Sequence, residues 1–272
     1  MDVIVNGKTS YCYTGGKRFD PQLPTIVFIH GAQNDHSVWA LQTRYFAHHG
    51  FGVLAVDLPG HGRSKGALLN NIGDMADWLL ALLDALDVTQ AMLVGHSMGS
   101  LIALEACAKA PERVNKLMLV GTAYPMKVAD ALLTSARDDE PSAIDMVNVW
   151  SHSSIAQKPA APAPGFYVMG GSQRLMQRMS QINPNKVFFT DFTACNNYSD
   201  GEQSALKVTC PTLFLSAKND QMTPPKASLH LSKHIPHSRT IIIENSGHQM
   251  MSEQPDAVLD ALFSFAKEAA QG

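Results

Sequence analysis

Several features that mark particular classes of protein are missing from this sequence. Only four of the 272 residues are cysteine, and Cys12, Cys107, Cys195 and Cys210 lie far apart, without a Cys-x-x-Cys or Cys/His ligand spacing. This usage argues against a disulfide-stapled scaffold and against a cysteine-based metal site. We expect reduced, mostly buried thiols and, from them, a cytoplasmic location.

Long apolar runs and a strong charge of one sign are also absent. The chain nowhere holds about 18 consecutive apolar residues, and its start, MDVIVNGKTS, places no basic region before an apolar stretch. We therefore expect neither membrane insertion nor a secretory signal. The net charge of -3 excludes an overall electrostatic footprint for nucleic acid.

Short apolar runs alternate with amphipathic helical stretches from about residue 25 onward. The runs are TIVFIH (25–30), VLAVD (53–57), AMLVGH (91–96), KLMLVG (116–121), PTLFLS (211–216) and TIIIEN (240–245). Continuous apolarity is typical of strands that are buried on both faces, so the pattern predicts an α/β fold with a parallel sheet between helices. An Asn6-Gly7 turn between two alternating runs predicts an antiparallel hairpin at the sheet edge.

Two of the helices are marked clearly. The first carries one apolar stripe at helical spacing. Its residues are Met75, Trp78, Leu79, Leu82, Leu83 and Leu86. The last helix begins at Pro255, where a first turn tolerates proline, and repeats apolar residues at 258, 259, 262 and 263.

The alternation breaks after residue 121 for roughly 85 residues, which is too long for an ordinary loop. We expect an inserted lobe with helical pieces near 126–136, 142–150 and 170–182 and a linker at 157–165. The lobe is rich in methionine and aromatic residues: Met126, Met146, Met169, Met176, Met179, Trp150, Phe166, Tyr167, Phe188, Phe189 and Phe192. Such adaptable apolar surface predicts a lid over a binding pocket. These residues could instead form the lobe's own small core, and both interpretations can hold for different residues.

The stretch from Gly95 to Gly99 spells Gly-x-Ser-x-Gly. Chance supplies these letters in about one chain in ten, but here they follow an apolar run and open the helical stretch SLIALEACAKA. A nucleophile elbow needs this order of strand, sharp turn and helix, with glycines where the backbone is strained and closely packed. Ser97 is therefore the candidate nucleophile. The alternative is a tight turn whose serine only caps a helix.

A serine nucleophile needs a base to take its proton and a carboxylate to orient that base. Among eleven histidines, His248 follows the last predicted strand, at the end of the sheet where parallel strands place ligands. Asp220 ends the run PTLFLSAKND and lies between the serine and the histidine in the chain. Asp57 also ends a strand, but it precedes the serine, so we expect it to hold the loop DLPGHGRS.

The oxyanion of a tetrahedral intermediate needs two backbone N–H donors. By position these are Met98, just after the nucleophile, and Ala32, in the loop after the first parallel strand. The Met98 N–H also lies at a helix N-terminus, where the peptide dipoles favour negative charge. We expect no cofactor and no metal ion for this chemistry.

Together these motifs resemble the α/β-hydrolase superfamily. They are His30-Gly31 followed by Trp39, DLPGHGRS, GHSMGS, PTLFLSAKND, and Gly247-His248 with Pro255. The resemblance covers nearly the whole chain. It implies the α/β-hydrolase fold with a mostly parallel eight-stranded sheet, a core of residues 1–121 and 205–272, and a helical cap over 122–204. Ser100 and Ala217 stand where many members carry glycine, and neither replaces a catalytic group.

The resemblance also implies the class of reaction. Ser97 argues against haloalkane dehalogenases and epoxide hydrolases, which carry aspartate as the nucleophile. Similar serine members are carboxylesterases, enol-lactonases, carbon–carbon bond hydrolases of aromatic degradation and cofactor-free perhydrolases. Cleavage of short to medium apolar carboxylic esters, small molecules, through an acyl-enzyme assumes least, because the triad and the oxyanion hole suffice. The non-enzymatic alternative is a ligand receptor, and the oligomeric state stays open.

Overall fold

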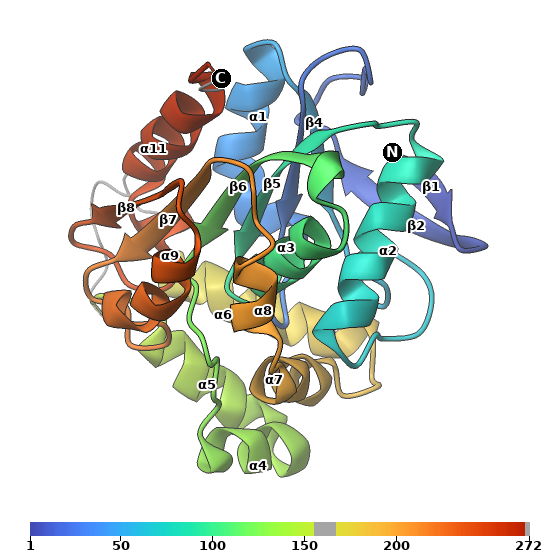
Figure 1. Cartoon of the computed structure of the whole chain (residues 1–272). Coiled ribbons are helices and arrows are strands. Elements are labelled where there is room, and N and C mark those ends of the chain that lie inside the picture. Colours follow the sequence, from blue (N-terminus) through green and yellow to red (C-terminus); the bar gives the residue numbers. More distant parts are fainter. Residues whose placement is uncertain (155–166, 270–272) are drawn as a thin grey trace.

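A computed structural model describes residues 1–154 and 167–269, in which one eight-stranded sheet forms the centre (Figure 1). The strands are β1 (Asp2–Val5), β2 (Lys8–Tyr13), β3 (Thr25–Ile29), β4 (Gly52–Val56), β5 (Ala91–His96), β6 (Val114–Val120), β7 (Thr212–Ala217) and β8 (Ser238–Ile243). Their order is β1-β2-β4-β3-β5-β6-β7-β8, and every neighbouring pair from β4 to β8 is parallel. The predicted α/β architecture is confirmed, whereas the linker expected at 157–165 lies outside the described residues.

The N-terminal hairpin forms as predicted. β1 and β2 pair antiparallel with Val5 opposite Lys8, and β1 is the first strand of the sheet. Asn6 and Gly7 both have positive φ, 50° and 73°. A two-residue turn needs this left-handed backbone at both positions if its twist is to match that of the strands.

Alternate side chains of each central strand pack into two separate cores. Val27 and Ile29 belong to the core under the helices α2 and α3, and Ile26 and Phe28 to the core under α1 and α11. The helices of the two faces are α2 (Ile72–Ala85), α3 (Met98–Lys109) and α9 (Leu229–His234) on one side, α1 (Ala40–His48) and α11 (Pro255–Lys267) on the other. Both clearly marked helices of the sequence are confirmed. All four cysteines are buried and free, also as predicted.

Strand β8 departs from the expectation of burial on both faces. Arg239, Thr240 and Ile242 are exposed, Ile242 to 41%. The prediction was wrong here because β8 is the last strand of the sheet and has a neighbour, β7, on one side only. Apolar letters alone do not distinguish such an edge strand from a central one.

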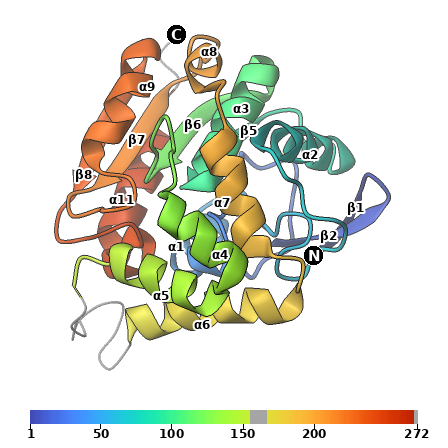
Figure 2. The same cartoon turned by 90° about the horizontal axis from the view of Figure 1, so that it is seen from below.

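A helical segment lies between β6 and β7. It consists of α4 (Asp130–Asp138), α5 (Glu140–Trp150), α6 (Val168–Ile182), α7 (Val187–Asn197) and the short α8 (Gly201–Ala205). Helices α4 to α7 gather across one end of the sheet (Figures 1 and 2). They share a small apolar cluster that includes Leu132, Ile144, Met176, Phe188 and Phe192. Helix α7 was not predicted, since its β-branched and aromatic residues are only moderate helix formers and packing decides the outcome.

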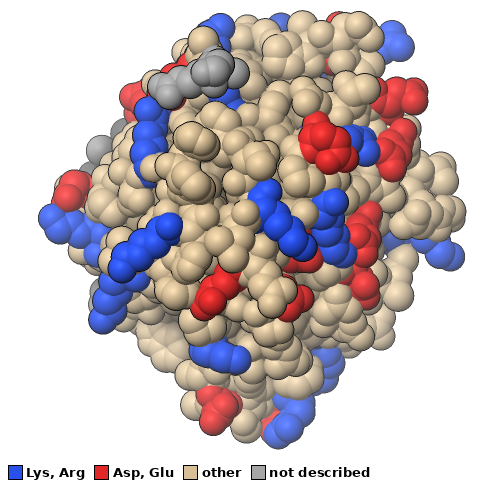
Figure 3. All heavy atoms as spheres, in the orientation of Figure 1, with Lys and Arg blue, Asp and Glu red and all other residues tan. Residues whose placement is uncertain are grey.

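On the face shown in Figure 3, basic and acidic side chains are interspersed. Among the described residues, no helix combines the length and the apolar character needed to cross a bilayer.

Candidate active site

Ser97 occupies a sharp turn between β5 and α3. Its backbone has φ 53° and ψ -119°, a conformation that costs energy in any residue other than glycine. The Ser97 N–H donates to the Val120 carbonyl at 2.9 Å, which ties the turn to β6. A Cβ on Gly95 would collide with the Gly99 carbonyl, and one on Gly99 would collide with the Ile29 carbonyl. The expected strained turn with close strand-to-helix packing is therefore present.

The structure brings the predicted base and acid into contact. Asp220 follows β7 and His248 follows β8, and His248 Nδ1 lies 2.8 Å from Asp220 Oδ2. Each residue is only 4% exposed. A carboxylate accepts, so Nδ1 carries the hydrogen, and Nε2 of the neutral ring keeps the lone pair. The ring centroid of His96, the residue before Ser97, lies 4.6 Å from that of His248, so the His248–Asp220 pair lies next to the turn that carries Ser97.

Thr223 completes the surroundings of Asp220. Its N–H donates to Asp220 Oδ1 at 2.8 Å and its hydroxyl to Oδ2 at 2.7 Å, while the Met222 N–H also donates to Oδ1. Burial raises the pKa of this carboxyl, but His248 and the Thr223 donors outweigh burial and lower the pKa to about 2. The carboxylate is thus ionised next to the imidazole. Sequence reasoning missed Thr223, because a threonine three residues after an aspartate carries no specific signal.

A second histidine holds the base in place. His96 Nε2 donates to the His248 carbonyl at 3.0 Å. Burial, together with the charge of His248, lowers the pKa of His96 to about 3. His96 therefore stays neutral and acts as a fixed donor. The next residue, Gln249, donates its N–H to the Ser151 carbonyl at 2.9 Å, which links the histidine loop to the end of α5.

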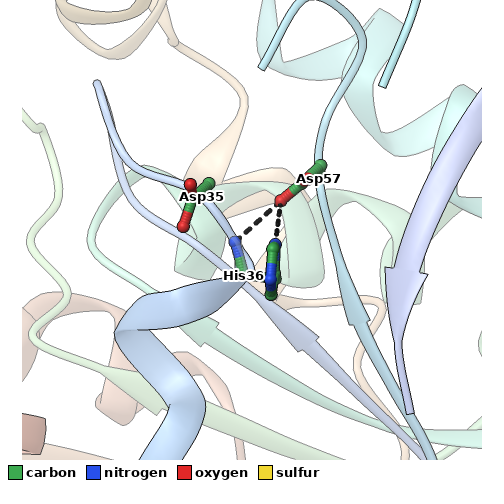
Figure 4. Close-up of side chains that lie close together, drawn as sticks. All are labelled: Asp35, His36 and Asp57. Atoms are coloured by element: carbon green, nitrogen blue, oxygen red, sulfur yellow. Dashed lines mark hydrogen bonds and ion pairs between the residues drawn. The ribbon is translucent and has the colours of Figure 1, made fainter. Parts of the chain in front are cut away.

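Asp57 binds residues of its own and the preceding loop and not His248, as expected. Its Oδ1 accepts from the N–H and from Nδ1 of His36, each at 2.8 Å (Figure 4). Its Oδ2 accepts from the Arg63 N–H at 2.8 Å. Burial raises the pKa of Asp57, but the His36 and Arg63 donors lower it overall. Asp35 lies beside this pair, close enough for the three residues to form a metal-ligand set. Its Oδ1, however, accepts from the N–H and hydroxyl of Ser37, so hydrogen bonds within the loop account for the cluster.

A cavity of about 180 Å³ lies between Ser97 and the helical segment. On the sheet side it is lined by Ala32, Ser97 and Thr223. From the helical segment and the chain that leads into it come Met126, Leu132, Trp150 and Phe192. Met176 and Phe188 instead belong to the apolar cluster of the segment, to which Phe192 also contributes. The apolar residues of the segment thus divide between the cavity and the segment's own cluster, with Leu132 and Phe192 contributing to both. Phe166 lies outside the described residues.

The comparisons with known proteins agree with this fold. The chain belongs to the family described as alpha/beta hydrolase fold, whose model matches residues 24–255. It is 25% identical over 269 residues to (E)-2-((N-methylformamido)methylene)succinate hydrolase of Acinetobacter baylyi, with 95% of this chain and 94% of that protein covered. It is 27% identical over 251 residues to 3-oxoadipate enol-lactonase 2 of the same organism, with 90% of this chain and 88% of that protein covered.

A solved structure gives the same result for the fold. An esterase from Exiguobacterium antarcticum superimposes with a TM-score of 0.83 at 21% identity, over 98% of this chain and 99% of that one. The protein is an α/β hydrolase. Its relatives include esterases, enol-lactonases and hydrolases with other substrates, so the family leaves the substrate to be argued from the site.

The lowered pKa of Asp220 predicts a pH-dependent part of the stability. A folded-state pKa of about 2, against about 3.9 in the unfolded chain, stabilises the fold above pH 4, and this stabilisation is lost as the pH falls towards 2. Between pH 5 and pH 3 the loss amounts to about 1 kcal/mol. Urea unfolding of the wild type and of Asp220→Asn should therefore show a stability difference that narrows by this amount. A stability difference between the two proteins that stays constant from pH 5 to pH 3 would contradict the lowered pKa of Asp220.

Proposed function

We propose that this protein is a serine hydrolase that cleaves carboxylic esters of short to medium apolar substrates through an acyl-enzyme intermediate. In this proposal Ser97 is the nucleophile, His248 the general base and Asp220 the acid that orients it. The observation that carries it is the buried His248–Asp220 hydrogen bond beside a serine in a strained turn. Strained backbone conformations of this kind cluster at active sites, where the surrounding structure holds a reactive side chain in place.

The first half of the reaction forms the acyl-enzyme. Ser97 Oγ attacks the ester carbonyl carbon and its proton passes to Nε2 of His248. Asp220 stays ionised and stabilises the imidazolium. When the tetrahedral intermediate collapses, the bond from carbon to the alcohol oxygen breaks, and the departing alcohol takes the proton from His248. Water then attacks the acyl group by the same route in reverse, releasing the carboxylic acid and restoring the Ser97 hydroxyl.

The developing oxyanion is assigned to two backbone donors, the N–H groups of Met98 and Ala32. Met98 is the first residue of α3, so its N–H has no partner within the helix and lies at the positive end of the helix dipole. Ala32 lines the same cavity as Ser97. Each donor of this kind is worth about 3 kcal/mol of transition-state stabilisation.

The helical segment is assigned the role of a cap, over 122–204, on a core of 1–121 and 205–272. The side chains of Met126, Leu132, Trp150 and Phe192 face the cavity that contains Ser97. Their apolar character suits an alkyl or aryl group, and a volume of about 180 Å³ limits the length of that group. The cytoplasmic location expected from the cysteines stays a prediction.

Other reactions use the same machinery. An enol-lactone is itself an ester, and one relative is named as an enol-lactonase. Carbon–carbon bond hydrolysis, perhydrolysis and ligand reception without turnover are further alternatives. A rate survey over aryl esters, lactones and carbon–carbon cleavage substrates separates them, and a complete lack of turnover would favour the receptor.

Replacing the nucleophile tests the proposal directly. Ser97→Ala should lower kcat by up to about a millionfold, because only binding and the oxyanion donors remain. A fluorophosphonate should add to Ser97 in the wild type, as seen by mass spectrometry of the digested protein. Ser199→Ala, an exposed serine, is the matched control and should react normally. An adduct on another residue, or a tenth of the wild-type rate in Ser97→Ala, would overturn the assignment.

The two buried aspartates at strand ends provide a matched pair of variants. Asp220→Asn should lower kcat by about 10³- to 10⁴-fold, since an amide neither stabilises the imidazolium nor selects the correct tautomer. Asp57→Asn removes an equally buried carboxylate that binds His36, so it should affect stability more than kcat. Steady-state kcat values of the folded variants distinguish the two aspartates. A large loss of kcat in Asp57→Asn with little change in Asp220→Asn would make Asp57 the acid.

The cavity predicts a preferred chain length. In a series of p-nitrophenyl esters, each methylene buried should raise kcat/KM about fourfold, from about 0.8 kcal/mol, until the cavity is full. The series should therefore rise and then fall. Trp150→Ala should move the peak to longer chains, whereas Val149→Ala, on the exposed side of the same helix, should not. A flat series, or a steady rise to long-chain emulsified substrates, would contradict a closed apolar cavity.

A further inference from the structure

The loop that follows β3 is anchored at the residue after Ala32. Gln33 is fully buried and has a positive φ of 59°. Its backbone N–H donates to Oδ2 of Asp191, on α7, at 2.8 Å. A left-handed backbone is unfavourable for glutamine and persists only where the surroundings hold it. The acceptor that holds it comes from the helical segment, 158 residues further along the chain.

Asp191 is part of a buried ion pair. The same Oδ2 lies 2.9 Å from Nε2 of His61, in the loop after β4, and neither residue is more than 1% exposed. The other ring nitrogen, Nδ1, lies 3.1 Å from the Pro59 carbonyl. Burial lowers the pKa of His61, but Asp191 outweighs burial and raises it. Both ring nitrogens face acceptors, an arrangement that favours the protonated ring beside the Asp191 carboxylate.

The side chain of Gln33 extends the anchor to two more helices. Its Nε2 lies 3.0 Å from the Met176 carbonyl and 2.9 Å from the Ser180 hydroxyl, both on α6. It lies 3.1 Å from Oε1 of Glu140, on α5. One residue of the loop thus contacts α5, α6 and α7, the helices that lie across this end of the sheet.

We propose that Asp191 and Gln33 are positioning residues that hold the Ala32 N–H where the oxyanion forms, so the helical segment shapes the oxyanion hole as well as the cavity. The inference rests on the function proposed above. Fixing the Gln33 N–H fixes the peptide plane between Ala32 and Gln33. The Ala32 N–H lies in the preceding peptide plane, which is joined to the fixed one through the two backbone dihedrals of Ala32, so the anchor restricts where that N–H can lie. A misplacement of about 1 Å can cost about a hundredfold in rate. A protonated His61 beside Asp191 offsets the charge of the carboxylate, which limits the negative charge that the anchor brings near an oxyanion.

Loss of the acceptor is the main test. With Asp191→Ala we expect kcat on a p-nitrophenyl ester to fall about 10- to 100-fold, with KM changed less than about threefold. Asp191→Asn keeps an amide oxygen that can accept the Gln33 N–H, so its loss should be smaller. Asp145→Ala removes an exposed carboxylate of the same helical segment and should stay within about twofold of the wild type.

A transition-state analogue separates positioning from mere stability. A trifluoromethyl ketone forms a bond from Ser97 Oγ to its carbonyl carbon, the proton moves to His248, and the ketone oxygen becomes an oxyanion. Its Kd should therefore rise in Asp191→Ala in proportion to the loss of kcat. A purely structural role would lower the melting temperature and leave kcat and this Kd unchanged in the folded variant.

A second variant decides the matter if Asp191→Ala does not fold. Gln33→Gly adopts the positive φ freely and keeps the N–H, but it loses the contacts with Met176, Ser180 and Glu140. We expect a loss of about tenfold in kcat and a parallel loss of ketone affinity. Wild-type kcat and ketone affinity in the folded variants would overturn the positioning role. The proposed function is judged separately, by the Ser97-dependence of wild-type turnover in the same assay, so the two failures are distinct.

Discussion

The close approach of α3 to the ends of β3 and β5 sets the geometry on which the rest of the site depends. Gly95 and Gly99 permit it, since a Cβ on either would collide with backbone. This approach forces the positive φ of Ser97 and places the first turn of α3 beside the β3 loop. The absence of a side chain at Gly95 and Gly99 thus allows the strained serine and the N-terminus of α3 to lie in the same turn.

The described residues contain three buried or nearly buried imidazole–carboxylate pairs, and the elements that they join differ. His248–Asp220 lies beside the serine, His36–Asp57 holds the loop after β4, and His61–Asp191 joins that loop to α7. In each, hydrogen bonds compensate for taking a charge out of water. The chemistry of the pairs is similar, and the proposed function assigns proton transfer to the first because it lies next to the turn that carries Ser97.

The helical segment has two physical tasks in one small structure. Part of its apolar surface packs into a cluster that holds α4 to α7 together, and part faces the cavity. Several of its polar contacts with the core meet at Gln33, where α5, α6 and α7 approach the β3 loop. In the function proposed above, substrate selection and the shape of the oxyanion hole would therefore be coupled through this one segment.

Local patterns in the sequence determined the strands, the two marked helices, the hairpin at Asn6-Gly7 and the turn at Ser97, because each depends on residues close together in the chain. Ser97, Asp220 and His248 follow β5, β7 and β8, and the sequence predicted that they lie close together because parallel strands end at one edge of the sheet. Only the tertiary structure decided the exposure of β8, the helix α7 and the volume of the cavity. It alone paired Asp191 with Gln33 and His61, because these contacts join segments more than 100 residues apart, at separations where no periodicity or spacing rule operates.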